Sequence, residues 1–244
     1  MASVRQLPPS VHLCPPSCAG DTYFVAPATA VTQGGARGNK MNRTLLTALL
    51  VLFAVSTADA ANLVKTYSYF SIGGRSLEQI QAELSKRGPS VKSTGMRHPG
   101  ATRMAFTSRI GYADSPDSCR IVSAVVTVKT HVILPRWKPN GKVGPDVRLF
   151  WNTLAADIKR HEDRHVEIAK DYGKRLESSL KGIGKEANCK IAAAKAREVT
   201  AKILSQHDQA QVEFDRVEMV NFESRIIRLM RYRIQQIEAG RLPG

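Results

Sequence analysis

In the first half of residues 61–244, hydrophobic and polar residues alternate regularly, which predicts β-strands there. Residues 63–70 and 102–112 form two such runs, and residues 120–134 alternate most regularly. Pro135 and the cluster Pro139-Asn140-Gly141 are expected to end this last strand. We expect its buried face to carry Val122, Ala124, Val126, Val128, Val132 and Leu134, with Ser123, Thr127, Lys129 and His131 on the other face.

A helical period interrupts these strands once and then dominates the second half. Ser76 and Gln79 belong to a capping-box pattern that opens an amphipathic helix to about residue 84, which Gly88-Pro89 stops. Longer helical patterns cover residues 145–180, 186–214 and 221–238. Strands followed by helices predict an α+β fold, with an N-terminal antiparallel β-sheet and one short helix, then a long helix and further C-terminal helices.

The first 60 residues have the pattern of a leader. Residues 1–40 are rich in Pro, Gly, Ser and Ala, and we interpret them as a disordered upstream extension before the true initiator, Met41. Residues 41–60 have the parts of a signal peptide: a basic start, an apolar run and the small residues Ala58-Asp59-Ala60. We expect cleavage after Ala60, a single domain over residues 61–244 and a secreted or periplasmic protein. The alternative is a genuine leader whose apolar segment stays as an anchor.

The net charge of the chain indicates which classes of binding partner to expect. Lys and Arg number 36 against 21 Asp and Glu, giving the 244-residue chain a formal net charge of +15. Such an excess favours anionic surroundings, such as nucleic acid, phospholipid headgroups or the cell envelope. Aromatic residues make up only 6% of the chain, no nucleic-acid-binding motif is present, and export separates the protein from chromosomal DNA. We therefore expect no nucleic-acid partner.

Export also changes the interpretation of the cysteines. Cleavage after Ala60 leaves only Cys119 and Cys189 of the four. In an oxidising compartment, two cysteines far apart in sequence are expected to form a disulfide. The alternative is two unpaired, buried thiols.

The sequence His161-Glu162-Asp163-Arg164-His165 is an H-E-x-x-H motif on the long predicted helix. Positions i and i+4 differ by about 40° around a helix, so both imidazoles can reach one metal ion. Zinc suits two neutral nitrogen ligands. In such motifs the carboxylate after the first histidine is the general base toward water on the metal, the role expected for Glu162.

The position of the motif supports this hypothesis. A single stripe of residues at helical spacing, which we expect to face the core, contains Trp151, Leu154, Ile158, His161, His165, Ile168 and Tyr172. Both histidines therefore belong to the predicted buried face. The alternative is a pair of core histidines satisfied by hydrogen bonds alone.

A catalytic zinc site needs a third protein ligand, and the sequence leaves its identity open. The glycine and third histidine of the metzincin motif do not follow His165. The later helices offer five candidates, of which His207 comes first and Glu218 second, followed by Asp208, Asp215 and Glu223. His131, on the polar face of the best strand, is a further candidate for substrate contact.

The order of these features resembles a known family. The strand beginning at Cys119, the segment Leu134-Pro135-Arg136-Trp137, Trp151, the metal motif and Cys189 together look like the bacterial domain of unknown function 922, regarded as predicted zinc-dependent secreted proteases. The similarity covers about residues 67–215. It implies a zincin-like fold, His161 and His165 as zinc ligands, Glu162 as the base and a Cys119–Cys189 bridge.

The similarity weakens after Asp215. The family's closing segment has an aromatic residue and Asp, then Thr-x-His-Gly. Phe214-Asp215 matches its start, but Glu218, Val220 and Asn221 stand in place of the Thr, His and Gly. The closing histidine is therefore absent from this chain.

Two functional hypotheses remain. The first is an exported zinc metallopeptidase acting on a peptide or protein of the cell envelope. The second is a non-catalytic envelope protein of the same fold, with a structural metal or a partner-binding role. The basic C-terminal helix either contacts an anionic membrane or envelope polymer, or packs its apolar stripe on its own domain.

Overall fold

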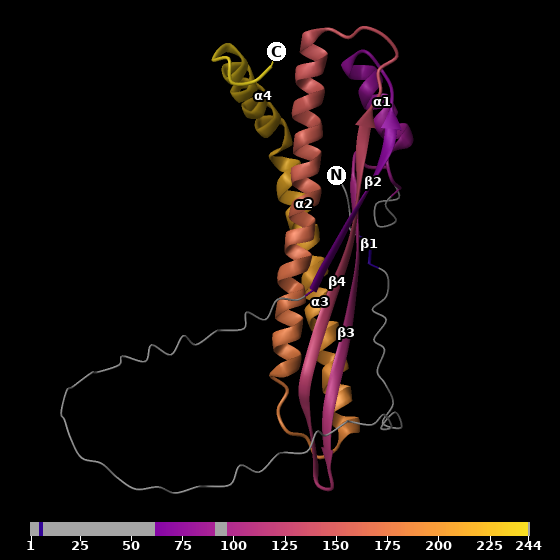
Figure 1. Ribbon diagram of the computed structural model, residues 1–244, viewed down its shortest axis with the longest axis vertical. Coiled ribbons are helices and arrows are strands. Elements are labelled where there is room, and N and C mark those ends of the chain that lie inside the picture. Colours follow the sequence, from indigo (N-terminus) through magenta and orange to yellow (C-terminus); the bar gives the residue numbers. More distant parts are fainter. Residues whose placement is uncertain (1–4, 7–61, 91–96, 244) are drawn as a thin grey trace, which may run out of the picture. The chain divides into compact units, whose positions relative to one another are not determined.

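The computed structural model describes residues 5–6, 62–90 and 97–243. Three long strands form the sheet: β2 (Asn62–Ile72), β3 (Ala101–Ser115) and β4 (Ser118–Trp137). The two-residue strand β1 (Arg5–Gln6) pairs with β3. The helices are α1 (Leu77–Arg87), α2 (Pro145–Lys181), α3 (Cys189–Val220) and α4 (Phe222–Glu238). The α+β prediction is confirmed (Figure 1). The upstream extension and the signal peptide lie outside the described residues, apart from β1.

The sheet is mixed, so the prediction of a wholly antiparallel sheet was wrong. Strands β3 and β4 form an antiparallel hairpin, whereas β2 pairs with β4 in parallel. The reason is that β4, the most apolar strand, takes the central position between β3 and β2. The connection from β2 through α1 to β3 therefore passes over β4, from one edge of the sheet toward the other.

Two details of β4 also differ from the prediction. Val122 is 55% exposed because the register shifts by one residue between Gly111 and Tyr112, which leaves Val122 as a bulge. Pro135 does not end the strand. The ladder to β3 ends at Ile133, so Pro135 lies where β4 pairs only with β2, and a missing N–H is tolerated at such an edge.

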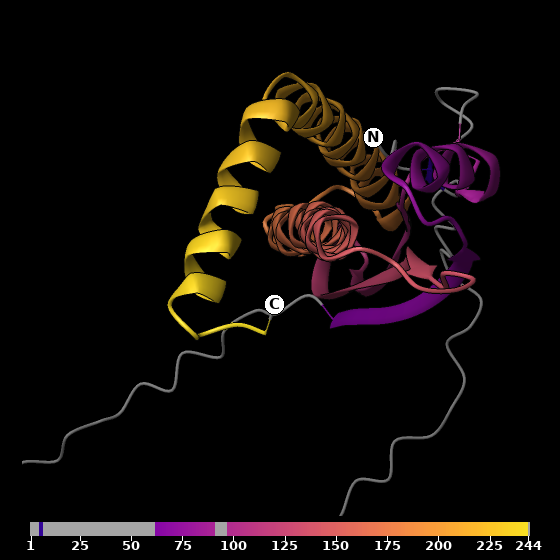
Figure 2. The same cartoon turned by 90° about the horizontal axis from the view of Figure 1, so that it is seen from above.

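Helices α1, α2 and α3 lie on one side of the sheet (Figure 2). Helix α2 begins with Pro145 in its first turn and ends at Lys181, just before Gly182, as its sequence predicts. Trp137 joins the end of β4 to this helix: its ring packs on that of Trp151 at 5.6 Å, and its Nε1 donates to the carbonyl of Gly74. Helix α3 returns antiparallel to α2 (Figure 1).

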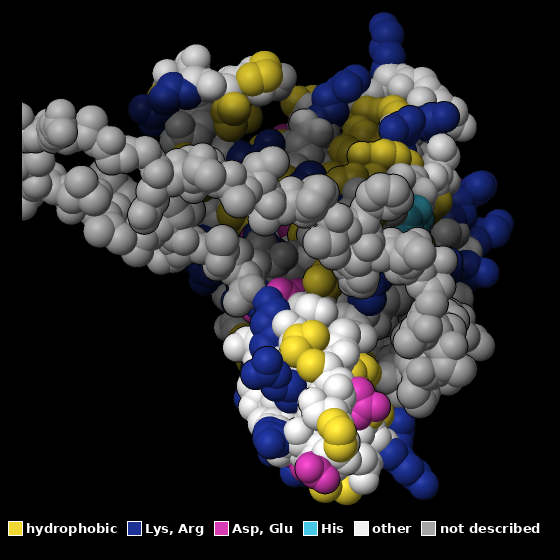
Figure 3. All heavy atoms as spheres, turned by 60° about the horizontal axis from the view of Figure 1, so that its bottom comes forward, with side chains coloured by type: hydrophobic (Ala, Val, Ile, Leu, Met, Phe, Trp, Pro, Cys, Tyr) yellow, Lys and Arg dark blue, Asp and Glu magenta, His cyan; other side chains and the backbone are white. Residues whose placement is uncertain are grey.

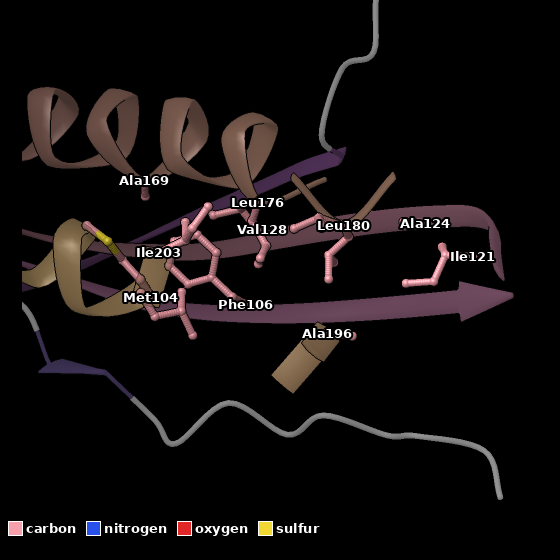
Figure 4. Packing of buried hydrophobic residues seen from close by; sticks show 12 residues of the cluster. Met104, Phe106, Ile121, Ala124, Val128, Ala169, Leu176, Leu180, Ala196 and Ile203 are labelled. Carbon is pink, nitrogen blue, oxygen red and sulfur yellow. The ribbon is translucent and has the colours of Figure 1, made fainter. Parts of the chain in front are cut away.

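Two apolar clusters fill the space between the sheet and the helices. The first joins the hairpin to the C-terminal half of α2 and to α3, and it includes Met104, Phe106, Val128, Leu176, Leu180 and Ile203 (Figure 4). The second joins the other end of the sheet to α1, the N-terminal half of α2 and α4 through Ile72, Ile80, Val132, Leu154, Ile158 and Ile226. Between these clusters α2 carries His161, Glu162 and His165, all buried.

The surface of the described region is basic. On the face drawn in Figure 3, Lys and Arg side chains are spread widely, with few acidic side chains among them. None of the described helices is long and apolar enough to cross a bilayer.

Candidate metal centre

Helix α2 holds the two motif histidines on its buried face, as the sequence predicts. His161 is 6% exposed and His165 is completely buried. Their Nε2 atoms lie 3.0 Å apart, so the two rings are directed at one point. Phe214 of α3 borders both rings, stacked on His161 at 4.9 Å and edge-on to His165 at 5.0 Å.

Asp215 brings a carboxylate to the same point from α3. Its Oδ1 atom lies 3.0 Å from Nε2 of His165 and 3.3 Å from Nε2 of His161. Burial acts to raise the pKa of Asp215, but the two histidines beside it outweigh this effect and lower that pKa. The three atoms form a compact triangle of possible metal ligands.

A contact with Gln211 determines which ring nitrogen of His165 carries the proton. The amide nitrogen of Gln211 donates to the carbonyl of His165 at 3.1 Å, so its oxygen is the atom 2.5 Å from Nδ1 of His165. An amide oxygen only accepts, so Nδ1 carries the proton and Nε2 offers a lone pair. This partner therefore leaves His165 in the tautomer that binds a metal through Nε2.

Charged residues surround the other ring. Glu218 places Oε2 3.5 Å from Nδ1 of His161 and is itself ion-paired with Arg160 and Arg225. Burial would raise the pKa of Glu218, but the hydrogen bond and charge of Arg160 reverse the effect and lower it. The ionised carboxylate can orient His161 as an outer partner.

Glu162 is held beside the pair by the sheet. Thr102 of β3 donates to its Oε2 at 2.8 Å, and Gly100 packs so closely that an added Cβ would meet Oε1 at 2.8 Å. Burial raises the pKa of Glu162, and the nearby histidines and the hydrogen bond from Thr102 only partly oppose this rise. A carboxylate with a raised pKa is suited to accept a proton near neutral pH.

The chemistry of these atoms fits a divalent cation. Oδ1 of Asp215 is buried, and within the described residues no hydrogen-bond donor satisfies it. A buried carboxylate without a donor is costly, and a cation between it and two imidazole lone pairs removes that cost. Two histidines and one carboxylate also form a known ligand set of catalytic zinc. A second grouping, Asp114 with Cys119 and Cys189, is ruled out because its sulfurs form a disulfide.

The structure places the other candidates elsewhere. His207 is completely buried, but it contacts Gln211 through Nε2 and packs on Phe106, one layer behind the ligands. Asp208 lies beside the Nδ1 atom of His207, and Glu223 is exposed in the first turn of α4. His131 bonds the hydroxyls of Thr66 and Ser68 on the strand β2.

Sequence reasoning named Asp215 only as one of five candidates, and it missed Thr102 and Gln211. One available signal was the spacing of His207, Gln211 and Asp215 by four residues, which puts three polar groups on one face of α3. Thr102 carries no comparable signal.

The fold and site together define an α+β protein in which an H-E-x-x-H helix and one acidic residue of the next helix form a possible metal centre. The chain matches the family described as bacterial protein of unknown function (DUF922) over residues 67–223, and it belongs to this family. No curated protein and no solved structure matches it. The expected family and the Cys119–Cys189 disulfide are thus confirmed.

Proposed function

We propose that this protein is an exported zinc-dependent metallohydrolase that cleaves peptide bonds. One observation carries the proposal: Nε2 of His161, Nε2 of His165 and Oδ1 of Asp215 converge within 3.3 Å of one another, next to the buried carboxylate of Glu162. His161, His165 and Asp215 would hold the ion. Zinc bound there supplies Lewis acidity, which polarises a carbonyl group and makes water more acidic.

Glu162 moves the proton in this mechanism. Its carboxylate takes a proton from water, and the oxygen of that water forms a bond to the carbonyl carbon of the substrate. The carbon–nitrogen bond then breaks, and Glu162 passes the proton to the leaving amine. Thr102 keeps Oε2 of Glu162 in place during both transfers.

Two features support action outside the cytoplasm. A signal-peptide pattern covers residues 41–60, and the disulfide between Cys119 and Cys189 is typical of oxidising compartments. A peptide or protein of the cell envelope is the proposed substrate. Arg228 and Arg231 are exposed on α4, and they are proposed to meet an anionic membrane or envelope polymer, although Ile226 shows that one face of this helix packs on its own domain.

Glu162→Gln tests the proposal. We expect hydrolysis of fluorescein-labelled casein by the zinc-loaded mature chain to fall by about 10²- to 10⁴-fold while zinc content stays stoichiometric, because the change removes a base but no ligand. Glu167→Gln is the control, since Glu167 is an exposed carboxylate on the same helix. Equal hydrolysis by Glu162→Gln and wild type would remove Glu162 from the mechanism. Zinc binding without any hydrolysis would instead support a structural metal site.

A further inference from the structure

A cavity of about 430 Å³ opens beside the proposed metal centre. This volume lies within the range of pockets that enclose small ligands. His161 and Glu162 contribute to its lining, so the cavity and the reacting groups are continuous. Its apolar walls come from α1, α2 and α4, and they are formed by Leu77, Ile80, Leu84, Leu154, Ile158 and Phe222.

The other charged side chains of the lining already have partners. Arg97 donates to the carbonyl of Gly88 at 2.8 Å. Arg225 and Asp157 form an ion pair at 3.0 Å, and Asp157 also accepts from Arg160 at 2.9 Å. A charged substrate group in this cavity would lose its hydration, and Arg225 and Asp157 could pair with it only by breaking the ion pair between them.

We propose that this cavity is a specificity pocket, which takes a large apolar side chain of the substrate next to the bond that is cleaved. The inference rests on the proposed function and adds the class of substrate. An apolar side chain gains free energy when it leaves water for apolar walls, whereas glycine leaves the cavity unfilled. Substrates with Leu or Phe at this position are therefore preferred over those with Gly or Asp.

Two small metal-binding probes test the pocket without any need for turnover. N-acetyl-leucine hydroxamate and N-acetyl-glycine hydroxamate share the zinc-binding group and differ in the side chain. We expect zinc-loaded wild type to bind the leucine compound about 10- to 100-fold more tightly in calorimetry, the gain that burial of one such side chain gives.

Ser85→Trp is designed to fill the cavity. Ser85 lines the cavity from an exposed position on α1, so the larger side chain removes no core contact. We expect this variant to lose most of the preference for leucine and to keep the affinity of wild type for the glycine compound. Lys86→Trp is the control, because Lys86 is the next exposed residue of α1 and does not line the cavity.

The outcomes separate the two proposals. If both hydroxamates bind wild type equally, or if Ser85→Trp keeps the full preference, the specificity pocket is refuted and the metal centre stands. If neither hydroxamate binds and the protein takes up no zinc, the proposed function itself fails, and the pocket fails with it.

Discussion

The Oδ1 atom of Asp215 lies 3.0 Å from the Nε2 atom of His165, although the two residues belong to different helices. This contact joins the C-terminal part of α3 to the middle of α2. It adds a possible third metal ligand to the two histidines of the H-E-x-x-H motif.

We predict that Asp215→Asn weakens zinc binding by more than about 100-fold, because loss of a ligand should exceed the 10- to 100-fold effect of losing an outer partner. The affinity is measured by competition with a chromogenic chelator. Glu213→Gln, an exposed change two residues away, is expected to bind zinc as wild type does. Unchanged affinity in Asp215→Asn would show that the third ligand is another group.

Gln211→Leu is predicted to weaken zinc binding by about 10- to 100-fold, since it removes the acceptor at Nδ1 of His165 and releases that ring to rotate or change tautomer. The state of the ring is read from the ¹⁵N chemical shifts of His165 in the metal-free protein. Gln209→Leu, at an exposed position of the same helix, is the control. A Gln211→Leu protein with wild-type shifts and affinity would contradict this positioning role.

The histidines of α2 and the carboxylate of α3 in the possible metal centre differ in how far the sequence could predict them. His161 and His165 were predictable because their spacing and the apolar stripe around them are local properties of one helix. Asp215 was not, because its place depends on how far α3 slides along α2, and that register is set by packing over the whole length of both helices. Residue type alone made His207 the first candidate for the third ligand. The register of the two helices instead places Asp215 beside the motif histidines and His207 against Gln211.

The same distinction applies to the sheet. Alternation located all three long strands, yet Val122 was assigned to the buried face because a bulge leaves no mark in the alternating pattern. Strand order was also not predictable from local patterns, since the parallel pairing of β2 with β4 depends on the path of the chain through α1.

Gly100→Ala is predicted to reduce hydrolysis by about 100-fold while zinc stays bound. An added Cβ would meet Oε1 of Glu162 at 2.8 Å and Cγ2 of Ile158 at 2.9 Å, so the carboxylate must shift. A displacement of about 1 Å in a catalytic group costs a factor of this size. The measurements are casein hydrolysis and zinc content. Gly184→Ala, where nothing lies within 4 Å of the added Cβ, should match wild type in both.

The buried side chain of His98 is predicted to make the folded protein less stable in acid. Burial lowers the pKa of His98 to about 4 from the ordinary value of 6.5, so the folded state favours the neutral ring. Its contribution to stability is complete above pH 6.5 and is lost progressively as the pH falls toward 4. We expect urea unfolding of the metal-free protein to show wild type losing more stability than His98→Asn between pH 7 and pH 4.5. Parallel losses in the two proteins would exclude His98 as the source.

The disulfide is predicted to stabilise the fold by up to about 4 kcal/mol, the chain-entropy value for a loop closed across 70 residues. The double variant Cys119→Ala, Cys189→Ala should show this loss in urea unfolding, and added reductant should affect wild type alone. Backbone hydrogen bonds between Cys119 and Glu186 remain available in the variant, so the strand is expected to stay attached. Equal stability of the two proteins would contradict the prediction.

The disulfide also fixes the N-terminal end of the long helix α3 to the strand β4. Cys189 is in the first turn of α3, and Asp215 stands about 39 Å further along the same helix at a rise of about 1.5 Å per residue. A slip of one turn, about 5.4 Å, would carry the carboxylate out of reach of an ion held by the imidazoles. The disulfide between Cys119 and Cys189 therefore restricts such a slip and helps to keep Asp215 beside the two histidines.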